Sequence, residues 1–170
     1  TIQKGIAAAE SIFALLDKPV ENDFGTRTLQ RAKGAVTYKE VEFNYLPDRP
    51  VLQQISFHAE PGQTVALVGR SGSGKSTLVN LLPRFYDEYT GQILIDGIDT
   101  KELKLADLRN QFAYVSQQVT LFNDTVAHNV AYGRLSDVEE KDIIEALEAA
   151  HAWEFVRALP EGINTLVGEN

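Results

Sequence analysis

Nine consecutive residues have the composition and spacing of a loop that binds phosphate. They are Gly69, Arg70, Ser71, Gly72, Ser73, Gly74, Lys75, Ser76 and Thr77. Glycines let a backbone wrap closely around an anion because they carry no Cβ. The N–H groups of such a turn and the positive end of a following helix dipole both attract phosphate. The pattern is a P-loop, and it predicts that the chain binds a nucleoside triphosphate.

Two side chains of this loop have chemistry of their own. Lys75 has the reach to contact the β- and γ-phosphates, and the Ser76 hydroxyl is suited to ligate Mg²⁺. The alternative is a glycine-rich turn that holds no phosphate, and the flanking segments argue against it. Residues 63–68 form a short apolar run with β-branched members, which predicts a buried parallel strand. Residues 78–82 place apolar side chains at helical spacing.

Two further residues are candidates for the same site. Tyr45 ends a predicted strand and offers a flat surface on which a purine ring can stack, although a half-buried strand tyrosine is an equal alternative. Gln117 follows residues 112–115, a second predicted buried strand. Ligands bind at the carboxyl edge of α/β sheets, so Gln117 could ligate Mg²⁺ or hold a water. On position alone, a surface loop residue is the better interpretation of Gln117.

The amino-acid composition excludes several classes of function. The chain has 170 residues, of which 44% are hydrophobic and 24% are charged, as in an ordinary globular domain. A formal net charge of −8 argues against a general nucleic-acid surface, which needs clustered Lys and Arg. There is no cysteine, which excludes disulfides, thiolate metal sites and cysteine nucleophiles. No run approaches the roughly 20 apolar residues that span a bilayer, so we expect no direct membrane span.

The remaining elements follow from local patterns. Residues 1–18 carry a helical apolar stripe and precede a polar stretch, so residues 1–33 are interpreted as a connector helix and linker, with an amphipathic core helix as the alternative. Residues 34–45, with a bulge at 39–40, and 51–59 predict a small antiparallel sheet.

Residues 91–97 predict a strand and a turn at Asp96-Gly97, which we prefer to a Walker B strand because the glycine follows directly. We expect helices at 103–109, from residue 124, and from a capping box at Ser136–Glu139.

Three stretches together resemble the ATP-binding domain of ABC exporters. They are VALVGRSGSGKST ending at Thr77, RFYD at 84–87 and YVSQQVTLFNDTVAHNVAYG at 114–133. The resemblance implies an α/β P-loop NTPase fold, with a RecA-like core, a small antiparallel β subdomain and the start of a helical subdomain. Residues 34–170 would then be a partial ATP-binding domain, with the P-loop core to about residue 120 and the helical subdomain from about 121.

The resemblance also implies ATP and Mg²⁺ as cofactors and gives roles to matched positions. Tyr45 would lie beneath adenine, residues 69–77 would hold the phosphates, and Gln117 would touch Mg²⁺ or the attacking water as a catalytic residue. Residues 165–169 resemble a loop that faces transmembrane helices, and residues 1–18 resemble the tail of the last such helix.

Partners implied in this way are a transmembrane domain of the same parent chain and a second copy of the ATP-binding domain, in a homodimer. The parent would lie at the cytoplasmic face of a bacterial inner membrane. The segments LRNQ, VSQ and LFNDTVA are similar to the corresponding segments of the lipid A flippases within this family, which implies a lipid-like substrate.

The sequence departs from the family because it contains no signature motif, true Walker B strand, catalytic glutamate, D-loop or switch histidine. We therefore expect a longer parent polypeptide, in which the strand at 65–68 gains neighbours; pairing of that strand on both sides within this chain would contradict the expectation. A nucleotide-binding docking module without hydrolysis is the first alternative. A P-loop kinase or GTPase is disfavoured for two reasons. The sequence contains no NKxD-like motif that would specify the base, and it contains Tyr45 as a candidate for stacking on the base.

Overall fold

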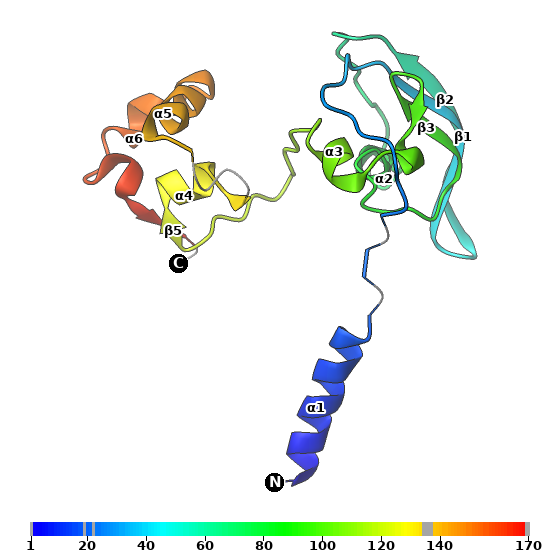
Figure 1. The fold of residues 1–170 in the computed structure, drawn as a ribbon, viewed down its shortest axis with the longest axis horizontal. Helices are drawn as coiled ribbons and strands as arrows, with labels where there is room; N and C mark the ends of the chain where they lie inside the picture. The colour runs from blue at the N-terminus through cyan, green and yellow to red at the C-terminus, as the bar shows by residue number, and fades with distance from the viewer. Residues whose placement is uncertain (1, 19, 22, 134–137, 169–170) are drawn as a thin grey trace. The chain divides into compact units, whose positions relative to one another are not determined.

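A computed structural model describes residues 2–18, 20–21, 23–133 and 138–168. The chain divides into two compact units, Thr1–Ala113 and Tyr114–Asn170, and each is described by itself (Figure 1). Among the described residues, no helix combines enough length and apolar character to cross a membrane.

The first unit is built on a four-stranded antiparallel sheet in the order β2-β1-β3-β4. Its elements are α1 (Ile2–Leu16), β1 (Val36–Leu46), β2 (Arg49–Ala59), α2 (Lys75–Leu81), β3 (Thr90–Ile95), β4 (Ile98–Asp99), η1 (Thr100–Glu102) and α3 (Leu105–Arg109). The register of β1 against β2 shifts between Tyr38 and Val41, and Glu40 has a positive φ of 48°. The predicted bulge at 39–40 is therefore confirmed.

A tight turn joins β3 to β4. Asp96 and Gly97 have φ angles of 51° and 80°, which confirms the predicted turn in place of a Walker B strand. The Asp96 carboxylate accepts hydrogen bonds from the backbone N–H groups of Lys33 (2.6 Å), Gly34 (3.1 Å) and Ala35 (2.9 Å). Asp96 thus connects the residues that precede β1 to the turn between β3 and β4.

Helix α2 packs on the sheet through apolar side chains. Leu78 and Leu81 of α2 join a cluster with Tyr38, Val41 and Ile93. The Tyr38 hydroxyl donates to the Leu78 carbonyl oxygen at 2.9 Å, and burial raises the pKa of Tyr38. The helix is therefore fixed to the sheet by apolar contact and by one buried hydrogen bond.

Two predicted parallel strands are not formed, and those two predictions are wrong. Residues 63–68 and 112–115 have no strand pairing, and Val68 and Val115 are 92% and 91% exposed. A buried parallel strand needs a neighbour along each edge. Every strand pair within the described residues is antiparallel and formed by other segments, so these apolar runs have nothing to pair with.

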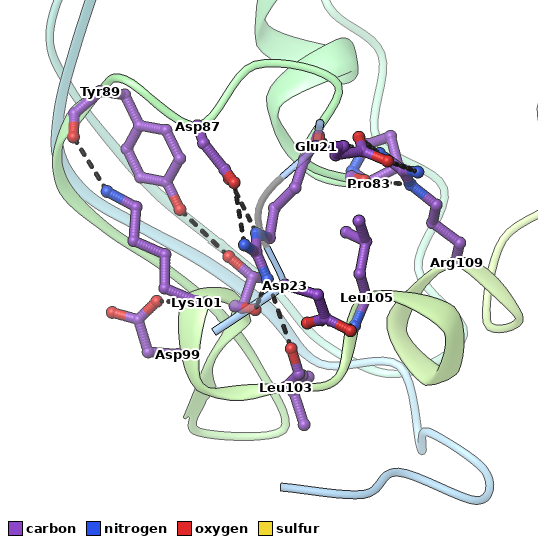
Figure 2. A network of polar contacts seen from close by, with 12 residues as sticks. Glu21, Asp23, Pro83, Asp87, Tyr89, Asp99, Lys101, Leu103, Leu105 and Arg109 are labelled. Atoms are coloured by element: carbon purple, nitrogen blue, oxygen red, sulfur yellow. Dashed lines mark hydrogen bonds and ion pairs between the residues drawn. The ribbon is translucent and has the colours of Figure 1, made fainter. Parts of the chain in front are cut away.

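Residues 21 and 23–29, which belong to the predicted linker, are hydrogen-bonded to the η1–α3 region. The Asp23 carboxylate accepts the backbone N–H of Leu105, the first residue of α3, at 3.0 Å. The Arg109 guanidinium donates to both carboxylate oxygens of Glu21, and this contact lowers the pKa of Glu21. These contacts hold the segment against α3 (Figure 2).

Arg84 carries a buried positive charge just beyond the end of α2. The residue is 4% exposed and has a positive φ of 56°. Its guanidinium donates to both carboxylate oxygens of Asp87 (2.7 and 2.8 Å) and to the carbonyl oxygens of Thr100 and Leu103 (both 3.3 Å). Asp87 and Leu103 are seen in Figure 2. The hydrogen bond to Asp87 raises the pKa of Arg84.

We predict that Arg84→Met destabilises the protein by about 2–4 kcal/mol, because it leaves Asp87 and two carbonyl groups without their donor. Urea unfolding measures the loss. Arg157→Met is the matched control, since Arg157 pairs with Glu154 at the surface with 55% of its side chain exposed; its cost should stay below about 0.5 kcal/mol. Equal costs for the two variants would contradict a structural role for the buried charge.

The second unit has a small helical core. Its elements are β5 (Asp124–Thr125), α4 (Val126–Val130), α5 (Glu140–Ala149), α6 (Trp153–Val156), η3 (Gly162–Asn164) and β6 (Leu166–Val167). Its buried residues are Ala131, Ile143, Leu147, Val156 and Ile163. The predicted helix after Asp124 is confirmed. Helix α5 begins at Glu140, and Ser136 of the predicted capping box lies outside the described residues, as does Glu169 of the predicted 165–169 loop.

Candidate functional site

The glycine-rich run forms a turn that leads directly into α2. Gly72 and Gly74 have positive φ angles of 79° and 87°, and Gly74 is the N-cap of the helix. A Cβ on Gly74 would lie 2.8 Å from Leu52 Cδ2 and 3.2 Å from the Val51 carbonyl oxygen. Glycine is required at position 74 both by its backbone conformation and by the close approach of β2.

The Lys75 side chain turns back into the loop. Its ammonium donates to the carbonyl oxygens of Gly69 (2.9 Å) and Arg70 (2.8 Å) and lies 3.4 Å from Ser73 Oγ. The first N–H groups of a helix have no acceptor within the helix. The start of α2 therefore combines a positive side chain with backbone donors, which is the chemistry that binds an anion.

The last two residues of the motif face different surroundings. Ser76 is exposed, whereas Thr77 is buried with 6% of its surface accessible. Within the described residues, no cluster of His, Cys, Asp or Glu could hold a metal ion. Mg²⁺ usually takes only one or two protein ligands beside substrate phosphates, so a single exposed Ser76 hydroxyl suits that arrangement.

Tyr45, at the end of β1, lies next to this loop. Its hydroxyl is 3.0 Å from Thr77 Oγ1. Its ring is nearly perpendicular to those of Phe43 (centroids 4.8 Å apart, 88°) and Tyr86 (5.2 Å, 83°), and half of the residue is exposed. The nearby Tyr45 hydroxyl raises the pKa of Tyr86. A cavity of about 400 Å³ adjoins these aromatic side chains.

The structure thus brings Tyr45 together with the P-loop but leaves Gln117 untested. Gln117 is exposed and belongs to the second compact unit, so its role beside the loop stays a prediction. Sequence reasoning missed the contact between Tyr45 and Thr77. The two residues are 32 positions apart, and no local pattern in one sequence signals such a pair.

Comparison with known protein families decides the class. The family model of the ABC transporter matches residues 52–167, a range that contains the P-loop, α2 and most of the second unit. The chain belongs to the ABC transporter family. The predicted resemblance is therefore confirmed at the level of the family.

Known relatives refine this ABC transporter assignment. The chain is 60% identical to the ATP-dependent lipid A-core flippase of Coxiella burnetii and 52% identical to that of Pseudomonas aeruginosa, over 99% and 100% of its length. It covers 29% and 28% of those two proteins. A solved structure of a bacterial Atm1-family ABC exporter with ATP bound matches 99% of this chain and 30% of its own, with a TM-score of 0.81 and 38% identity.

These likenesses confirm the predicted fold class, a P-loop NTPase domain of the ABC exporter type with an antiparallel β part and a helical part. They also show that the chain spans less than a third of the length of the relatives it matches.

We predict that Gly74→Ala costs more stability than Gly72→Ala. Each places a Cβ at positive φ, which costs roughly 1–2 kcal/mol, but only position 74 also brings that Cβ against β2, since position 72 has nothing within 4 Å. Denaturant unfolding of both variants measures the difference. Equal losses would show that the approach of β2 to the loop does not constrain the turn.

Proposed function

We propose that this chain is the ATP-binding part of an ABC exporter, whose parent couples ATP binding and hydrolysis to export of a lipid-like substrate. The observation that carries the proposal is the turn that leads into α2, where the Lys75 ammonium lies against the loop and Thr77, in the first turn of the helix, contacts Tyr45. The family match and the name lipid A-core flippase of several relatives support it. Lipid A is the candidate substrate.

The residues present fit ATP and Mg²⁺. A loop with two left-handed glycines, an ammonium group and a helix N-terminus suits a triphosphate, the exposed Ser76 hydroxyl suits Mg²⁺, and the half-exposed Tyr45 ring suits a purine. Bound Mg²⁺ would supply neutralisation of phosphate charge. Residues 69–77 and Tyr45 would bind and orient the nucleotide, and Gln117 would hold Mg²⁺ or the attacking water.

The partners and location of the parent protein belong to the same proposal. We expect a transmembrane domain in the same polypeptide, a second copy of the ATP-binding domain in a homodimer, and a place at the cytoplasmic face of the inner membrane. Residues 1–33 would connect to the transmembrane domain, and residues 34–170 would form the ATP-binding part, with its helical subdomain from about residue 121. The likeness to an Atm1-family exporter with ATP bound is consistent with this arrangement.

Lys75→Ala should weaken ATP binding by about 10- to 100-fold, because charge-assisted hydrogen bonds of roughly 1.5–3 kcal/mol are lost. Calorimetric titration measures the affinity. Lys141→Ala is the control, since Lys141 lies on α5 with 78% of its side chain exposed. An unchanged affinity in the Lys75 variant would remove this residue from the site.

Tyr45→Ala should weaken the binding of ATP and GTP by similar factors of about 5- to 100-fold, because base stacking is worth about 1–3 kcal/mol and tolerates any base. Competition of both nucleotides against a fluorescent analogue measures the two affinities. A large loss for one purine and none for the other would contradict a stacking role.

A nucleotide-binding docking module without hydrolysis is the second candidate, because the residues of the P-loop and Tyr45 suit nucleotide binding without themselves supplying a catalytic base. Phosphate release separates the two. Under the docking alternative, both the 170-residue chain and the full-length protein bind ATP without releasing phosphate. Under the exporter proposal, the full-length protein releases phosphate and its Lys75→Ala variant does not.

A further inference from the structure

The hydroxyl of Thr77 has an unusual place for a residue of a phosphate-binding loop. Thr77 is buried, while its neighbour Ser76 is exposed. Its Oγ1 lies 3.0 Å from the Tyr45 hydroxyl, and either oxygen can donate in this hydrogen bond. The hydroxyl of Thr77 is therefore engaged by the aromatic side chain of another strand.

This hydrogen bond completes a three-sided restraint on the Tyr45 ring. Phe43 and Tyr86 contact the ring nearly at right angles, so neither is stacked on it. They limit where the ring can lie, but edge contacts of this kind are weakly directional. The Thr77 hydroxyl adds a directional contact at the far end of the ring.

We propose that Thr77 is a positioning residue for the base, which acts by holding the Tyr45 ring through its hydroxyl. This inference rests on the proposed function. Thr77 lies in the first turn of α2, two residues after Lys75, so the same short helix presents donors to the phosphates and fixes the surface beneath the base. The hydrogen bond links the two halves of the nucleotide site.

A different role for Thr77 makes a different prediction. If its hydroxyl serves the phosphates, then its removal weakens the binding of any polyphosphate. If it also serves Tyr45, then its removal weakens ATP more than a polyphosphate that carries no base. Inorganic tripolyphosphate has the phosphates of ATP without adenine, so a comparison of the two ligands separates these roles.

The test is calorimetric titration of the full-length protein and its variants with ATP and with tripolyphosphate. Thr77→Val keeps the shape and removes the hydroxyl, and it should weaken ATP binding about 3- to 10-fold, as expected for one lost hydrogen bond. Tripolyphosphate binding should weaken less than ATP binding, and the tripolyphosphate binding that remains reports that the variant is folded. Thr77→Ser should restore ATP binding.

Tyr45→Phe tests the same contact from the other side and keeps the ring. It should reproduce the part of the Thr77→Val loss that is specific to ATP, and the double variant should lose no more than Thr77→Val alone. If Thr77→Val does not fold, Tyr45→Phe alone decides, since it should weaken ATP and spare tripolyphosphate. Thr100→Val is the matched control, because the Thr100 hydroxyl contacts the Tyr89 hydroxyl at 3.1 Å, both in the Arg84 region; it should change neither affinity.

Each other outcome has a distinct meaning. Equal losses for ATP and tripolyphosphate would overturn the inference by assigning Thr77 to the phosphates. Additive losses in the double variant, or no loss in either single variant, would overturn it as well, while ATP binding by the unaltered protein leaves the proposed function standing. An unaltered protein that binds neither ligand would refute the proposed function itself.

Discussion

The buried guanidinium of Arg84 is the interaction on which the first unit depends. Removing a charge from water is costly, and it is tolerated only where good hydrogen bonds replace the lost hydration. Asp87 and two backbone carbonyl groups do so here. Those carbonyl groups belong to the η1–α3 region, so the charge joins the end of α2 to a segment nearly 20 residues further on. The same segment also contacts Glu21 and Asp23 (Figure 2).

Helix α2 is held along its whole length. It has only seven residues, about two turns, so a shift at one end moves the other. Arg84 fixes the chain after its last turn, the Tyr38 hydroxyl bonds to Leu78 in its middle, and Tyr45 contacts Thr77 in its first turn. The donors at its start are therefore placed by contacts that come from the sheet and from the far end of the helix.

The sequence was informative where structure is decided locally. The P-loop helix, the antiparallel strands with their bulge and the turn at Asp96-Gly97 each follow from spacing or from turn chemistry within a few residues. Residues 63–68 and 112–115 have an equally clear apolar pattern and form no strand, because a parallel strand is defined by its neighbours as much as by itself. A local pattern cannot predict contacts between residues 32 or more positions apart. The hydrogen bond between Tyr45 and Thr77 is one example, and the hydrogen bond from the Lys33 N–H group to Asp96 is another.

The inward turn of Lys75 has a consequence for how the loop would meet an anion. Its ammonium already donates hydrogen bonds to the carbonyl oxygens of Gly69 and Arg70. An anion that bound to the ammonium would therefore exchange with these carbonyl oxygens as its hydrogen-bond partner. Both contacts are exposed, so water could hydrate each carbonyl oxygen that gave up the ammonium. Residues 63–70 belong to no strand, so such an exchange would break no hydrogen bond between strands. An anion that bound to Lys75 would therefore compete with the backbone of the loop and leave the pairing of the sheet unchanged.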